Sequence, residues 1–179
     1  NAFSFTLYGS EGLAPLWSLA PGSRSYLTND SLGSGLEAGM AYNPITGHLV
    51  VGSFVDATHL RGFYILDALS GDDLGQLRQT TSSGVNLFSP MASGISYPGY
   101  SIGIADDGAI YAASRSPGSQ KVAIYRWASE TSAVYTAYSP TSLTPPLGYD
   151  LRVRGSGTGT QLILGAGNSS TASSYALLF

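Results

Sequence analysis

One hairpin pattern recurs along this chain and limits what it can fold into. The stretch GMAYNPITGHLVVGS, residues 39–53, contains two short apolar runs around a turn with Pro44 and Gly47. The stretch SIGIADDGAIYAASR, residues 101–115, repeats the pattern around Gly108. Proline presets one backbone angle of a turn and glycine supplies a positive φ, so both stretches predict β-hairpins.

Further apolar runs follow each hairpin in the same order, and a third unit starts after the second. The chain lacks long windows of helical periodicity, and its Gly, Ser, Thr and β-branched residues favour strands over helices. The additional predicted strands are residues 62–68 and 74–79 in the first unit, 122–128 and 133–139 in the second, and 149–155, 161–167 and 175–179 in the third.

Antiparallel strands in this order, with a small inner strand and a polar outer one, are typical of β-propeller blades. The sequence therefore predicts an all-β fold, a single domain over residues 1–179, with about three four-stranded antiparallel blades at residues 36–80, 97–140 and 147–179. Propellers contain about four to eight blades, so we expect half of a larger propeller. A β-sandwich is the alternative.

The N-terminal residues are expected to add strands to these blades. Residues 1–22 are predicted to hold N-terminal strands, and residues 15–22 (PLWSLAPG) are a candidate to close the last blade, which lacks its fourth strand. The chain begins with Asn1 rather than Met, so we expect a processed protein or a piece of a longer one.

Composition narrows the possible partners and the compartment. Charged residues make up only 11% of the chain, against a usual quarter, and the net charge is -3. Such a surface is suited to packing against copies or a partner, and it favours neither nucleic acid nor an anionic membrane. There is no cysteine and no apolar run long enough to span a membrane. We expect a secreted or cell-surface protein.

Five segments stand out as a set: LAPLWSLAPGSRSYLT, GMAYNPITGHLVVGS, GIADDGAIYAASR, AIYRWASE and LRVRGSGTGTQLILGA. This set resembles a family of secreted bacterial repeat proteins of unknown function that are predicted to be β-propellers. The resemblance covers most of residues 13–179. It implies the propeller fold, and it implies no activity, cofactor or site residue.

Aromatic side chains are the first candidates for a binding surface. Trp17, Tyr135 and Tyr138 lie on predicted strands with polar neighbours, which is the setting in which aromatic rings stack on sugars. The alternative is packing between blades, where aromatic rings bury a large area. Trp127 and Tyr125 are predicted to pack in this second way.

Charged side chains give the remaining candidates. His48 follows the turn glycine Gly47 and is either a ligand or a residue that caps the turn or packs beside Tyr42. Arg152 and Arg154 alternate with apolar residues and so share one strand face. They are expected to meet an acidic partner, or to pair with Asp107 or Glu130 of a neighbouring blade.

Metal and catalytic signals are weak. Asp56 and His59 share a loop, but two ligands do not make a metal site. The Asp-Asp-Gly of residues 106–108 is explained by the backbone needs of a turn and lacks the calcium-loop spacing. No nucleophile, phosphate or acid–base motif is present. The sequence predicts no catalytic residue, no cofactor and no metal.

These observations predict a non-enzymatic extracellular module for structure or interaction. It would assemble with copies of itself, or dock on a larger protein that completes the propeller, through exposed strand edges. One alternative is a carbohydrate-binding, lectin-like propeller. A further alternative is an enzyme whose site is built from loops on the propeller face.

Overall fold

The structure is a computed structural model that describes residues 15–27, 37–54, 60–88, 99–114, 122–140, 147–166 and 175–178. These residues form eleven β-strands and one short 3-10 helix, η1 (Gly157–Gly159), and they contain no α-helix. The all-β prediction is therefore confirmed. No helix among the described residues is long and apolar enough to cross a membrane.

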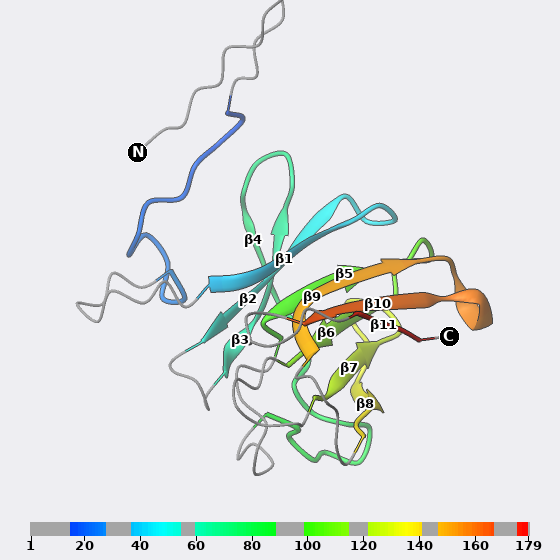
Figure 1. Cartoon of the computed structure of the whole chain (residues 1–179). Coiled ribbons are helices and arrows are strands. Elements are labelled where there is room, and N and C mark those ends of the chain that lie inside the picture. Colours follow the sequence, from blue (N-terminus) through cyan, green and yellow to red (C-terminus); the bar gives the residue numbers. More distant parts are fainter. Residues whose placement is uncertain are drawn as a thin grey trace, which may run out of the picture.

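The strands form three antiparallel sheets that follow one another along the chain (Figure 1). The first sheet contains β1 (Glu37–Asn43), β2 (His48–Phe54), β3 (Leu60–Asp67) and β4 (Asp73–Gln76). The second contains β5 (Ser101–Ile104), β6 (Ile110–Ala113), β7 (Ile124–Trp127) and β8 (Val134–Tyr138). The third contains β9 (Leu147–Arg154), β10 (Gln161–Ala166) and β11 (Tyr175–Leu178), in the order β11-β10-β9.

Each sheet has the meander order that the repeated hairpins predict, and the predicted turn glycines hold positive φ values of 76° at Gly47 and 83° at Gly108. The fourth strand of the first sheet is shorter than predicted, because β4 ends at Gln76. The two four-stranded antiparallel sheets are compatible with either propeller blades or a sandwich.

The sheets pack in series through their first strands, since β1 contacts β5 and β5 contacts β9. Glycine allows this close approach. A Cβ atom on Gly39 of β1 would lie 2.7 Å from Cγ1 of Ile102 on β5, and a Cβ on Gly103 of β5 would overlap the side chain of Val153 on β9. We call the contact between the first and second sheets the first junction, and that between the second and third sheets the second junction.

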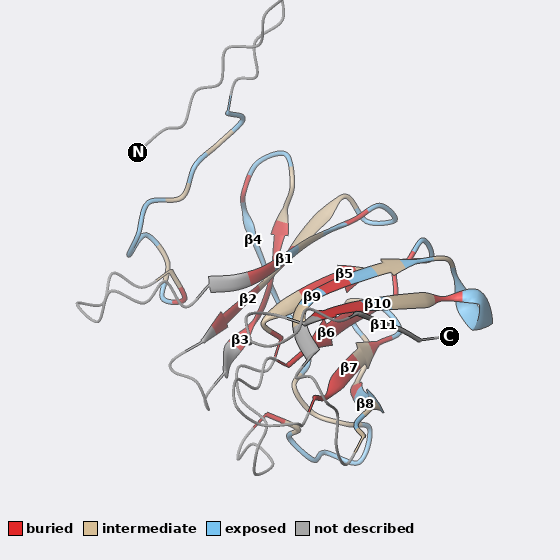
Figure 2. Ribbon diagram, in the orientation of Figure 1, coloured by how far each residue is buried: buried red, intermediate tan, exposed pale blue. Residues whose placement is uncertain are grey.

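The first junction has an aromatic core, and buried residues extend along the strands of both sheets that form it (Figure 2). Phe63 from β3 meets Trp127 from β7 edge to face, with ring centroids 4.9 Å apart. Phe88 inserts between the sheets and lies 4.6 Å from the ring of Tyr125. Arg78 lies in the same segment after β4 as Phe88, and its carbonyl accepts a hydrogen bond from Nε1 of Trp127. The predicted packing role of Trp127 and Tyr125 is confirmed.

The second junction is built from smaller side chains. Its buried residues include Ile124 and three alanines of the second sheet, and Leu151 and Leu164 of the third sheet. Its aromatic members are Tyr111 of β6 and the partly buried Tyr138 of β8, and among the described residues no ring from a loop enters it as Phe88 enters the first junction. The alanines are Ala105, Ala109 and Ala113.

The outer face of the first sheet is covered by residues 15–27. Tyr26 stacks on Tyr64 with centroids 3.7 Å apart, and the hydroxyl of Ser53 donates to the carbonyl of Tyr26. Residues 15–22 contain one bend at Leu16, a turn at Pro21 and Gly22, and no strand, so the strand predicted there is wrong. The segment is held by side-chain contacts with a sheet face rather than by a ladder of backbone hydrogen bonds. The predicted strands before residue 15 lie outside the described residues.

Candidate functional site

A groove lies beside the second junction, with one wall on the second sheet and the other on the turn between β9 and β10. It has a volume of about 510 Å³, within the range of small-molecule sites. Tyr111, Arg126 and Tyr135 form one wall, because they pair directly across β6, β7 and β8 and so share one face of the sheet. The other residues that line this tyrosine–arginine groove are Ala137, Gly157, Thr158, Thr160 and Leu162.

The guanidinium of Arg126 is held between the two tyrosines. Its Nε donates to the hydroxyl of Tyr111 at 2.8 Å, and NH1 donates to the hydroxyl of Tyr135 at 2.9 Å. Its Cζ lies 5.5 Å and 5.7 Å from the two ring centroids, within the range of cation–π attraction. Burial of the guanidinium lowers its pKa, but the tyrosine contacts outweigh burial and raise the pKa of Arg126. The group therefore stays charged.

The opposite wall is an exposed polar turn (Figure 2). The hydroxyl of Thr160 donates to the carbonyl of Gly157 at 2.9 Å, which closes the 3-10 turn. Asp107 of the second sheet accepts hydrogen bonds from the backbone N–H groups of Gly157 and Ala109. The bond from Gly157 is the main cause that lowers the pKa of Asp107, and the charge of Arg126 acts in the same direction. The turn is thus fixed against the second sheet.

The two predicted tyrosines of β8 have different environments. Tyr135 is 45% exposed and faces the groove. Tyr138 is partly buried and packs against the core of the second junction. A register shift leaves Ala137 without a partner on β7, and such a bulge re-aims the residues that follow it. Only Tyr135 therefore fits the predicted role in binding.

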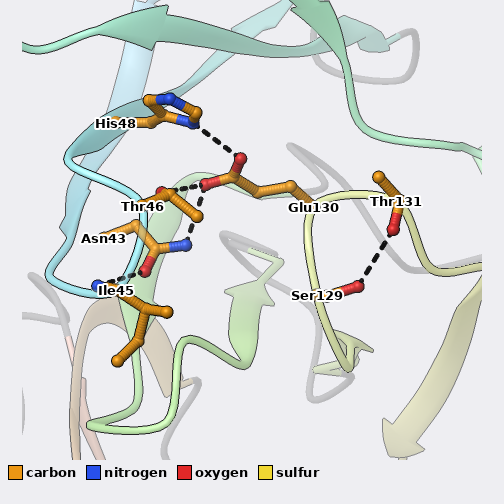
Figure 3. Close-up of polar contacts among 7 residues, drawn as sticks. All are labelled: Asn43, Ile45, Thr46, His48, Ser129, Glu130 and Thr131. Atoms are coloured by element: carbon orange, nitrogen blue, oxygen red, sulfur yellow. Dashed lines mark hydrogen bonds and ion pairs between the residues drawn. The ribbon is translucent and has the colours of Figure 1, made fainter.

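His48 joins a second polar cluster, at the first junction (Figure 3). Its Nδ1 lies 2.7 Å from Oε2 of Glu130, while the side chains of Asn43 and Thr46 donate to Oε1 at 2.8 Å and 2.6 Å. The Glu130 side chain is only 11% exposed. His48 thus connects the β1–β2 turn to the β7–β8 turn, a role that differs from the predicted ligand, cap or Tyr42 contact.

Trp17 packs against the first sheet instead of presenting a binding face. Its Nε1 donates to the carbonyl of Ala68 at 3.0 Å, and its ring lies so close to Gly71 that a Cβ there would approach within 2.8 Å. Arg24 of the same segment donates to the carbonyl of Gly71 and pairs with Asp73. Trp17 is a structural anchor for residues 15–27.

Arg152 and Arg154 share the outer face of β9, as predicted, but the predicted pairing with Asp107 or Glu130 is wrong. Arg152 pairs with Asp150 at 3.3 Å, and Nε of Arg154 donates to Gln161 at 2.7 Å. Both partners lie in the third sheet itself, whereas Asp107 accepts from Gly157 and Glu130 contacts the first sheet. These arginines do not join the groove.

Several other predicted features can be compared with the structure. Asp106 and Asp107 are turn residues whose carboxylates accept backbone N–H groups of the β9–β10 turn. Asp56 and His59 lie outside the described residues. Within the described residues, no group of three or more His, Asp or Glu side chains is placed to hold a metal ion.

Sequence reasoning missed Arg126 as a site residue and left Tyr111 open between sugar stacking and core packing. The available signal was the single charged residue in the apolar run VAIYRWA, but a cation in a strand carries no information about its neighbours across the sheet. Searches against protein-family models, curated proteins and solved structures found no match to this chain.

Proposed function

We propose that the three sheets are blades of a β-propeller larger than this chain. The proposal is supported by the meander order of each sheet and by the serial contact of β1, β5 and β9, which would line the axis of a ring. Three blades are fewer than a closed propeller needs, so the ring would be completed by a second copy or by a larger protein.

We propose that the protein is a non-enzymatic extracellular binding module and that the tyrosine–arginine groove binds carbohydrate. The observation that carries this proposal is the exposed Tyr135 beside the fixed guanidinium of Arg126. An exposed aromatic ring offers an apolar surface to the C–H groups of a sugar, and the adjacent polar groups can bond its hydroxyls. Thr158 and the backbone of the β9–β10 turn supply further polar groups on the opposite wall.

A glycan array tests this function with two matched variants. Tyr135→Ala removes the exposed ring from the groove, whereas Tyr42→Ala removes a ring that is 55% exposed on β1 in the first sheet. We expect the wild type and Tyr42→Ala to bind the same glycans and Tyr135→Ala to lose binding. Failure to bind any glycan, or equal binding by Tyr135→Ala, would contradict the proposal.

Self-assembly through strand edges is a second candidate function. It is favoured by the third sheet, in which β11 is the outermost described strand, whereas the other two sheets have a fourth strand. A strand of a second copy could add to this edge by backbone hydrogen bonds. Light scattering over a range of concentrations tests the idea: a stable dimer or a polymer supports it, and a monomer at every concentration rejects it.

A further inference from the structure

One row of side chains in the second sheet differs in chemistry from the equivalent row of the first sheet. Four residues that pair directly with one another across the four strands of a sheet form a row. The first two sheets each have such a row near the hairpin turn between their first two strands. The row in the first sheet is Ala41, Val50, Ile65 and Gly75, and the row in the second is Gly103, Tyr111, Arg126 and Tyr135. The row of the first sheet contains only apolar residues and glycine, whereas the row of the second sheet contains the cation Arg126 at the position of Ile65.

Arg126 has no carboxylate partner within the described part of the chain, a feature it shares with Arg78 and Arg154. Arg24 and Arg152, in contrast, pair with carboxylates. Its two hydrogen bonds go to tyrosine hydroxyls and use two of the five N–H donors of a guanidinium. The nearby carboxylate of Asp107 is occupied by two backbone N–H groups. Arg126 therefore has donors and charge available for a ligand.

The geometry suits a carboxylate in particular. A guanidinium binds a carboxylate through two parallel hydrogen bonds, and such charge-assisted pairs are stronger than neutral ones. The two tyrosine contacts already restrict the side chain of Arg126, so little further conformational entropy is lost on binding. The exposed ring of Tyr135 is adjacent and can stack on the rest of the ligand.

We propose that the tyrosine–arginine groove selects acidic sugars, with the carboxylate of a hexuronate bound by Arg126 and its pyranose ring stacked on Tyr135. This inference rests on the proposed carbohydrate-binding function and adds the ligand class to it. Because the contact is an ion pair in a groove open to solvent, binding weakens as the salt concentration rises.

Isothermal titration calorimetry tests the inference with chemically matched probes. The probes are trisaccharides of galacturonate, glucuronate and mannuronate, their methyl esters, neutral galactose, glucose and mannose trisaccharides, and sodium acetate and phosphate. We expect at least one uronate trisaccharide to bind about tenfold or more tightly than its own methyl ester, which keeps the ring and loses the charge.

Variants assign the contact to Arg126. We expect Arg126→Gln to lose about tenfold or more in uronate affinity, and Arg126→Lys to lose affinity as well, because lysine keeps the charge without the planar fork. Arg154→Gln removes the same charge from the exposed face of β9 and should leave the affinity unchanged. The Arg126→Lys result stands if circular dichroism shows that only Arg126→Gln is misfolded.

Each contrary result has a separate meaning. Equal affinity for uronates and neutral trisaccharides, unaffected by Arg126→Gln, overturns the acidic-sugar inference and leaves carbohydrate binding intact. Acetate or phosphate that binds as tightly as the uronates overturns it in favour of a simple anion site. The absence of binding by every saccharide overturns both the inference and the proposed function.

Discussion

The first and second junctions solve the same packing problem with different side chains. Both bring first strands into close contact through a glycine, and both connect a β-hairpin turn to the next sheet by polar contacts. The first junction is filled by Phe63, Phe88 and Trp127, whereas the second combines alanine and aliphatic residues with the single buried ring of Tyr111. The same contact between first strands is thus filled with different side chains, and the tyrosine–arginine groove lies beside the second junction.

The polar contacts differ in the same way. At the first junction the carboxylate of Glu130 receives side-chain donors from Asn43, Thr46 and His48, in a setting largely shielded from water. At the second junction the exposed carboxylate of Asp107 receives a backbone N–H from Gly157. We therefore expect the first junction to contribute more to stability and the second to tolerate change.

The largest expected effect is loss of the aromatic core. Trp127→Ala should lower the free energy of unfolding by about 3–5 kcal/mol, because a fully buried ring is replaced by a cavity. Leu164→Ala in the second junction should cost about 2 kcal/mol, the low end for a buried leucine. Urea denaturation measures both values. Equal losses would break the proposed contrast between the junctions.

Loss of the Glu130 carboxylate should have the next largest effect. Glu130→Ala leaves the buried amide of Asn43 without its acceptor and removes the partner of His48, which should cost about 2 kcal/mol. The matched variant Asp107→Ala should cost about 1 kcal/mol, because the N–H of Gly157 is exposed and can bond to water. Thermal and urea unfolding of both variants test the order, and the reverse order would contradict it.

The close approach of β5 and β9 should make the protein sensitive to any side chain at Gly103. Gly103→Ala should destabilise the protein by about 1–2 kcal/mol, because the added methyl group overlaps the side chain of Val153. Shortening the opposing side chain should relieve the overlap, so the Gly103→Ala/Val153→Ala double variant should be more stable than the sum of the two single effects. A double-mutant cycle in urea measures this coupling. Strict additivity would show that the glycine is not needed for contact.

The smallest expected effect is a loss of folding stability at low pH that depends on Asp107. The pKa of Asp107 is lowered in the folded protein from its ordinary value of 3.8, mainly by the N–H of Gly157. The ionised carboxylate thus stabilises the fold above about pH 4, and this contribution is lost as the pH falls through the lower folded-state pKa. Asp107→Asn should be less stable than the wild type at pH 7, and the gap should close in acid.

Urea unfolding between pH 7 and pH 2 checks this prediction. The pKa of Asp67 is also lowered, chiefly by the backbone N–H of Ser70, but this residue is unchanged in Asp107→Asn. The difference between the two proteins therefore isolates Asp107. A constant difference at every pH would show that the charge of Asp107 does not support the second junction.

The strands and their hairpins could be predicted from the sequence because their causes are local. Alternation of apolar residues and the Pro, Asp and Gly residues of the turns act within a few positions, and the strands of all three sheets follow from them. The prediction for residues 15–22 failed because apolar residues that pack on a sheet face produce the same pattern as a strand. Local pattern does not distinguish a ladder of backbone hydrogen bonds from side-chain docking.

The candidate site depended on contacts that only the tertiary structure decided. Tyr135 was predicted, but its neighbours Tyr111 and Arg126 become neighbours only through the register of β6, β7 and β8. His48 and Glu130 are separated by 82 residues and meet only because the first two sheets stack. The repeated hairpins and the all-β class can be predicted from the chain alone, whereas the stacking of the sheets sets which strand faces are buried and which line the groove. The physical reason is that turns and strand periodicity are encoded over a few residues, while the pairing of side chains between sheets depends on the register and packing of segments far apart in the chain.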